Sequence, residues 1–139
     1  DSMKAINQKA QRVMDILTEQ PGTFEKSWKF DNAPDVFMAV HVEKLNTIDA
    51  GKIFSVSHHY LQSGDVMYDP EMEFLKTKNG EYYPLSFYQS SIGYRREAII
   101  YSIDGRTIDR YDPRLQKELV SFANVWMSNI KAQQKLKAR

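Results

Sequence analysis

The sequence predicts an α+β fold in which a curved antiparallel meander of about six or seven strands is flanked by an N-terminal and a C-terminal helix. Apolar residues recur every three or four positions over residues 3–19 and again over residues 113–136, which is typical of amphipathic helices. Between these segments, apolar and polar residues alternate with period two, which is typical of strands. No helical pattern separates these strands, so antiparallel neighbours are expected and dinucleotide-binding or P-loop folds are not.

Length and composition limit the class of protein. A chain of 139 residues with 42% hydrophobic and 12% aromatic residues is long enough to bury a core, and we expect a single domain over residues 1–139. The 19 basic and 18 acidic residues give a net charge of +1, so bulk charge favours neither nucleic acid nor a membrane surface. The chain has no cysteine, which excludes disulfides and thiolate metal sites. No apolar run approaches the roughly 20 residues of a membrane span.

The first predicted helix covers residues 3–19. Ser2 is expected to cap its start, and Pro21 and Gly22 are expected to end it. One face carries the apolar side chains, which we expect to pack on the sheet: Met3, Ile6, Ala10, Val13 and Leu17.

The predicted strands follow one another through short turns. Alternation marks strands around Trp28 and Phe30, over residues 36–43 and over residues 54–60. Asn79-Gly80 and Asp104-Gly105 predict two-residue hairpins, since both turn positions need positive φ. Asp49, Ala50 and Gly51 form a looser predicted turn.

The second predicted helix covers residues 113–136. Asp112 is a favourable N-cap and Pro113 suits the first helical position. Its expected buried stripe consists of Leu115, Leu119, Phe122, Trp126 and Ile130. We expect both helices to pack on one face of the sheet.

Residues 58–74, HHYLQSGDVMYDPEMEF, concentrate histidine and acidic side chains around a Gly and a Pro. A structural interpretation makes His58 a core residue with one hydrogen bond and Asp69 a turn residue. A functional interpretation needs His58, Asp65, Asp69 and Glu71 to converge on a metal ion. No recognised metal or nuclease spacing is present, and Glu71 and Glu73 share a strand face that is usually only an exposed polar face.

The same segment resembles an uncharacterised bacterial family found on plasmids, conjugative transposons and phages. Members carry His-Tyr-Tyr-x-Gln-Asn-Gly-Asp-Leu-Met-x-Asp-Pro-Glu-Met, then a Tyr-Pro-x-Ser stretch. In this chain the pattern falls on His58, Tyr60, Gln62, Gly64, Asp65, Met67, Asp69, Pro70, Glu71 and Met72. His59 and Ser63 depart from it, and Leu61 fills a variable position. The resemblance implies a cytoplasmic accessory protein of a mobile element and supplies no catalytic residue.

These observations favour a non-enzymatic accessory or regulatory protein whose binding surface lies around residues 58–73. Its candidate residues are His58, Tyr60, Gln62, Asp65, Asp69 and Glu71. The catalytic residues are unknown, and neither a metal nor a cofactor is predicted. The alternatives are a metal-dependent hydrolase or nuclease that uses the acidic cluster, and a purely structural motif. The partner is a protein, a nucleic acid or a small molecule; nucleic acid would need a local basic cluster such as Arg95, Arg106, Arg110 and the C-terminal lysines.

Overall fold

The structure is a computed structural model that describes residues 2–20 and 25–137. Its elements follow in the order α1 (Gln8–Thr18), β1 (Ser27–Phe30), β2 (Val40–Ile48), β3 (Gly51–Gln62), β4 (Asp65–Thr77), β5 (Tyr82–Tyr88), β6 (Arg95–Glu97), β7 (Ile99–Tyr101), β8 (Ile108–Tyr111) and α2 (Pro113–Gln133).

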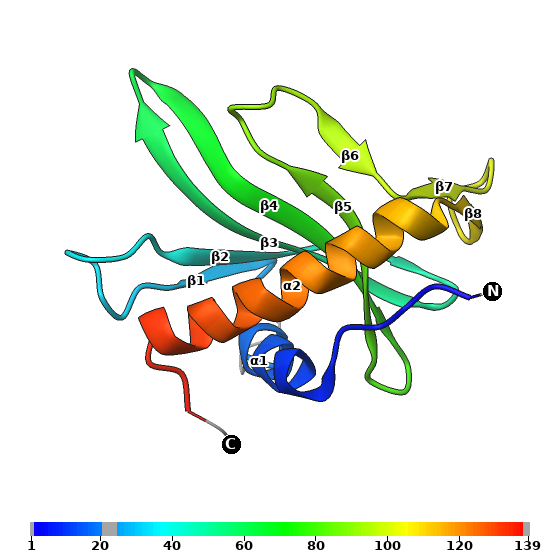
Figure 1. Ribbon diagram of the computed structural model, residues 1–139, viewed down its shortest axis with the longest axis horizontal. Helices are drawn as coiled ribbons and strands as arrows, with labels where there is room; N and C mark the ends of the chain where they lie inside the picture. Colours follow the sequence, from blue (N-terminus) through cyan, green and yellow to red (C-terminus); the bar gives the residue numbers. More distant parts are fainter. Residues whose placement is uncertain (1, 21–24, 138–139) are drawn as a thin grey trace.

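Strands β1 to β6 form one open antiparallel sheet in sequence order, and β7 and β8 form a separate two-stranded ribbon (Figure 1). The predicted α+β class, with one helix before and one helix after an antiparallel meander in the sequence, is confirmed. Asn79-Gly80 lies between β4 and β5 and Asp104-Gly105 lies between β7 and β8, so both turns are where they were predicted. Both loops are longer than the two residues predicted, since they span residues 78–81 and 102–107.

Both helices pack on one face of the sheet, as predicted, and α2 runs diagonally across it with α1 beside it (Figure 1). The sheet contributes its inward positions to this core, among them Phe54, Val56, Met72 and Phe74. Leu119 and Trp126 of the predicted α2 stripe are buried against them. Phe122 is 40% exposed, so its predicted burial is wrong.

The β7–β8 ribbon covers one end of the opposite face of the sheet. Ile53 and Leu75 directly adjoin Phe54 and Phe74, and successive strand residues point to opposite faces. They form a second buried cluster with Ile48, Leu85 and Ile99, against which Tyr101, Ile108 and Tyr111 pack. The rest of this face is polar, and we call it the outer face.

The first helix begins at Gln8, so the prediction of a helix from residue 3 with Ser2 as its cap is wrong. The backbone N–H of Ile6 donates to the carbonyl of Tyr82, which holds the preceding segment extended along β5. Asn7 is the N-cap instead, and its side chain accepts from the N–H of Ala10. The predicted stop at Pro21 and Gly22 lies outside the described residues.

Two other boundaries differ from the predictions. The strand expected from Val36 begins at Val40, because Val36 and Phe37 donate to the carbonyl of Ala33 in a turn. Asp112 caps α2 as predicted, but α2 ends at Gln133 and not at residue 136.

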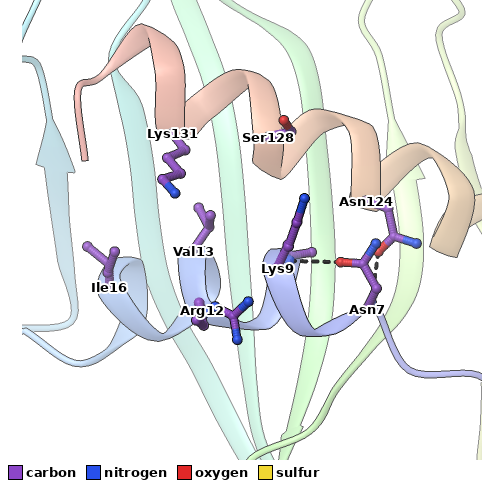
Figure 2. A pocket seen from close by; sticks show the side chains of 9 residues that line it. Asn7, Lys9, Arg12, Val13, Ile16, Asn124, Ser128 and Lys131 are labelled. Atoms are coloured by element: carbon purple, nitrogen blue, oxygen red, sulfur yellow. Dashed lines mark hydrogen bonds between the residues drawn. The ribbon is translucent and has the colours of Figure 1, made fainter. Parts of the chain in front are cut away.

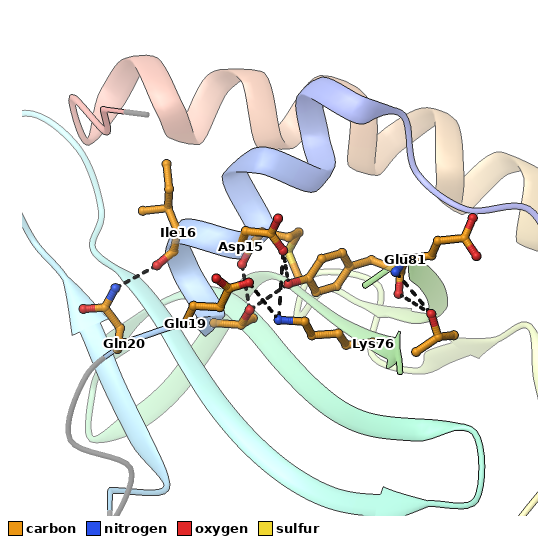
Figure 3. A network of polar contacts seen from close by, with 10 residues as sticks. Asp15, Ile16, Glu19, Gln20, Lys76 and Glu81 are labelled. Atoms are coloured by element: carbon orange, nitrogen blue, oxygen red, sulfur yellow. Dashed lines mark hydrogen bonds and ion pairs between the residues drawn. The ribbon is translucent and has the colours of Figure 1, made fainter. Parts of the chain in front are cut away.

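A buried polar network fastens the end of α1 to β4 and β5 (Figure 3). The hydroxyl of Tyr82 donates to Asp15 at 2.7 Å and contacts the hydroxyl of Thr18 at 2.8 Å. Lys76 adds an ion pair with Glu19 at 3.1 Å. Burial raises the pKa of Tyr82 and also raises the pKa of Asp15. The network therefore fixes α1 over the sheet.

Candidate binding surfaces of the β3–β4 hairpin

The segment singled out in the sequence forms the end of a long hairpin made by β3 and β4. Their pairing shifts between Ser57 and His59, where Asp69 and Pro70 stand opposite His58. This is a β-bulge, which bends the strand and redirects its side chains. Beyond the bulge, residues 59–62 of β3 pair with residues 65–68 of β4.

Strand alternation divides the six candidate residues between two faces. Tyr60 and Gln62 lie on the same face as His58, toward the helices, and Asp65 is paired with Gln62 on that face. Asp69 lies beside His58 in the groove described below. Glu71 lies on the outer face with Ser55 and Arg95.

His58 is a core residue with one hydrogen bond, as the structural interpretation has it. It is 6% exposed, and its Nδ1 lies 3.0 Å from the carbonyl oxygen of Ala39. Its ring meets the edge of Trp126 with the ring centroids 5.6 Å apart. These contacts join β3 to α2 and to the segment that precedes β2.

The three carboxylates of the metal hypothesis do not converge. Asp65 lies at the hairpin tip, four residues along the strand from Asp69 and so about 13 Å away. Asp69 accepts a hydrogen bond from Gln89 at 2.6 Å. Glu71, on the other face, accepts from Ser55 at 2.6 Å and pairs with Arg95. Across residues 2–20 and 25–137, no group of three His, Asp or Glu side chains is arranged to hold a metal ion.

A groove of about 340 Å³ lies on the helix side of the hairpin, and we call it the Trp126 groove. Its walls come from the segment before β2, from the bulge and from α2: Val36, Phe37, Met38, His58, Asp69, Pro70, Trp126, Asn129 and Gln133. Large apolar side chains that line it are exposed, with Val36 72% exposed and Phe37 39% exposed. Such a surface is typical of an interaction site.

Trp126 lines this groove with an unused hydrogen-bond donor. The residue is 5% exposed, and its indole Nε1 has no hydrogen-bond partner among the described residues. A buried donor without an acceptor costs roughly 1–3 kcal/mol. The atom itself is buried, so an acceptor on an occupant would reach it, and remove this cost, through a small shift of the side chains around Trp126. Sequence reasoning missed the feature because Trp126 fits the apolar stripe of its helix.

The outer face carries a second, polar hollow. The rings of His41 and His59 stack with their centroids 3.6 Å apart, and Ser57 lies 3.1 Å from His59 Nδ1. Burial, together with the neighbouring His59 and Lys29, lowers the pKa of His41 to about 4. Burial also lowers the pKa of His59. A general base works best when its pKa is near the working pH, so His41 is poorly suited to acid–base catalysis at neutral pH.

The basic residues considered for nucleic acid do not form one cluster. Arg95 pairs with Glu71 on the outer face. Arg106 pairs with Asp49 at 3.0 Å, near the β7–β8 ribbon. Arg110 lines a shallow hollow beside Ile100 on the same ribbon. These cations therefore give no continuous track for a phosphate backbone.

A family model described as a domain of unknown function (DUF6908) matches residues 3–136. No curated protein matches the chain. No solved structure matches it either. Within the part of the chain that the structure describes, neither helix is long and apolar enough to span a bilayer.

Proposed function

The chain belongs to the family of the domain of unknown function DUF6908, and from that premise we propose that it is a non-enzymatic binding protein. Its docking site is the Trp126 groove, which residues 58–73 build against α2. Its occupant is an extended segment of a partner protein with apolar side chains. The single observation that carries the proposal is the unpartnered indole N–H of Trp126 beside a groove that combines exposed apolar and polar side chains.

The groove favours a polypeptide because apolar and hydrogen-bonding features occur together. Val36, Phe37 and Met38 offer exposed apolar surface for side chains. A peptide carbonyl is the acceptor that the indole N–H of Trp126 lacks. No lysine or arginine lines the groove, so it offers little to a phosphate backbone.

The cellular role that we propose rests on the resemblance of residues 58–74 to the mobile-element family. The Gly-Asp-x-Met-x-Asp-Pro-Glu-Met core supports an accessory or regulatory protein of a bacterial mobile element that works in the cytoplasm. In the structure this core forms the hairpin tip and the bulge beside the groove. The proposal therefore gives a role to the bulge of this segment, because His58, Asp69 and Pro70 form part of the wall on which the partner docks.

The test is a selection of peptides from a random library displayed on phage, using the full chain as target. Selected peptides should shift the NMR signal of the Trp126 indole N–H and leave that of Trp28 in place. Val36→Asp with Phe37→Asp should weaken binding by about tenfold or more, because both remove apolar surface at the site.

The matched control is Ile100→Asp with Ile103→Asp, which adds the same two charges to exposed side chains of the β7–β8 ribbon. It should leave peptide affinity unchanged. Peptides that instead shift His41 and His59, or that bind the Val36/Phe37 variant with full affinity, would refute the groove as the docking site.

A further inference from the structure

A second groove lies between the two helices, and we call it the interhelical groove (Figure 2). It has a volume of about 310 Å³. Its lining comes from the α1 region and from α2: Asn7, Lys9, Ala10, Arg12, Val13, Ile16, Asn124, Ser128 and Lys131. Its α2 residues, Asn124 and Lys131 among them, lie on the opposite side of that helix from Trp126, given 3.6 residues per turn. The groove is therefore distinct from the Trp126 groove.

Three cations surround the interhelical groove. Lys9 points from α1 toward α2, and Lys131 points from α2 toward α1, while Arg12 lies along α1 at the edge (Figure 2). No acidic side chain lines the groove, and none of the three cations forms an ion pair with a carboxylate of the described chain. The groove therefore gathers three cations on one concave surface without a carboxylate to offset their charge.

Polar and apolar groups complete the lining. Asn124 accepts from the backbone N–H of Asn7 at 2.9 Å through Oδ1, and its NH₂ group can donate. Val13 and Ile16 of α1 provide an apolar wall near Lys131 (Figure 2). An anionic group would meet the cations, and a short hydrocarbon body would lie on the apolar wall.

The size of the groove decides between a small ligand and a macromolecule. Small-molecule sites usually measure about 300–1,000 Å³, and this groove is at the lower end of that range. None of its lining residues is aromatic, whereas single-stranded nucleic acid is held by stacking on aromatic rings as well as by charge. Both observations favour a small ligand.

We propose that the interhelical groove binds a small organic anion, a carboxylate or phosphate group carried on a short aliphatic chain. The acidic group lies among Lys9, Arg12 and Lys131, and the chain lies against Val13 and Ile16. This inference is independent of the proposed function, because no residue is shared by the two grooves.

The experiment titrates the full chain with octanoate and, in a second arm, with octyl phosphate, by calorimetry and by NMR of the methyl groups. Binding should shift Val13 and Ile16 and should weaken as sodium chloride is added. Tighter binding of octanoate identifies a carboxylate ligand, and tighter binding of octyl phosphate a phosphate ligand. Octanol and inorganic phosphate, which each carry half of the expected ligand, should bind much more weakly than either.

Lys9→Gln with Lys131→Gln should lower the affinity about tenfold. The matched control, Lys26→Gln with Lys117→Gln, removes the same charge from exposed sites outside the groove and should change the affinity less than twofold. Octanol or inorganic phosphate binding as tightly as the amphiphiles, an equal loss in both double variants, or methyl shifts away from α1 would each overturn the proposal.

Discussion

Tyr82 donates its hydroxyl hydrogen to Asp15 over 2.7 Å from a side chain with no exposed surface. The same oxygen contacts Thr18, so one phenol from β5 engages two side chains of α1. A buried hydroxyl with both partners satisfied fixes the position of a helix more specifically than apolar contact alone.

Tyr82→Phe should therefore destabilise the chain by about 1–3 kcal/mol, because Asp15 and Thr18 lose a buried partner. Urea unfolding at neutral pH measures the loss. The neighbouring Tyr83→Phe is the control, since that hydroxyl contacts only Glu81 at 3.1 Å on a partly exposed side chain. It should cost less than about 0.5 kcal/mol. Equal losses for the two variants would contradict the role given to the network.

Gly51 should tolerate no side chain. Its φ is +156°, and a Cβ atom there would lie 2.0 Å from the carbonyl oxygen of Lys76 on the neighbouring strand. Gly51→Ala should lower the free energy of unfolding by about 2–4 kcal/mol. Gly64→Ala, at φ +87° in open space, should cost about 1–2 kcal/mol from backbone strain alone. If Gly64→Ala lowered the free energy of unfolding more than Gly51→Ala, the close approach of β4 would not be what excludes a side chain at position 51.

His41 should make stability depend on pH below neutrality. Its pKa is about 4 in the folded chain against 6.5 as its ordinary value, so the unfolded chain binds a proton that the folded chain excludes. The contribution of His41 to the free energy of unfolding should therefore be constant above pH 6.5. It should fall as the pH falls from 6.5 toward 4. His41→Phe keeps a ring against His59 and removes the titration.

The comparison is urea unfolding of the wild type and of His41→Phe at pH 8, 7 and 5. Between pH 7 and 5 the variant should lose less stability, by on the order of 1 kcal/mol after allowance for solvent screening of a partly exposed ring. Between pH 8 and 7 the two should change in parallel. Parallel behaviour across the whole range would rule out His41 as the source.

Asp69 separates the metal-dependent interpretation from the others. Because Asp65, Asp69 and Glu71 lie apart, manganese, magnesium and zinc should leave the melting temperature unchanged. Asp69→Asn keeps an acceptor for Gln89 and should cost little, whereas Asp69→Ala should cost about 1–3 kcal/mol with or without metal. Calorimetric uptake of one ion per chain that disappears in Asp69→Asn would restore the hydrolase hypothesis.

Local patterns predicted the parts of the fold that local chemistry decides. Asp112 and Pro113 placed the start of α2, and Asn79-Gly80 placed the β4–β5 turn. The start of α1 was misplaced because Ile6 is bonded to Tyr82, a partner far away in the sequence. Periodicity gives a residue's face but not its tertiary partners.

The candidate site was predicted only in part for a similar reason. The segment 58–73 does form a hairpin, as expected. Because of strand alternation and the bulge, however, Asp69 contacts Gln89 whereas Glu71 contacts Arg95 on the outer face. Trp126 reaches the same groove from a helix whose pattern indicated only burial. The exposure of Phe122 likewise could not be foreseen, since a regular apolar stripe is wider than the surface that the sheet covers.

The hydrogen bonds between the segment before α1 and α2 bear on how the chain folds. Lys4 and Gln116, which exchange two of them, are separated by 112 positions, and Asn7 and Asn124 by 117. Contacts between such distant residues carry a large loop-closure entropy and slow folding. We therefore expect the neighbouring strands of the meander to pair before the two helices dock. In that order of events the inward face of the sheet, with Val56, Met72 and Phe74, would be open to other molecules until the helices cover it, which would favour aggregation at that stage.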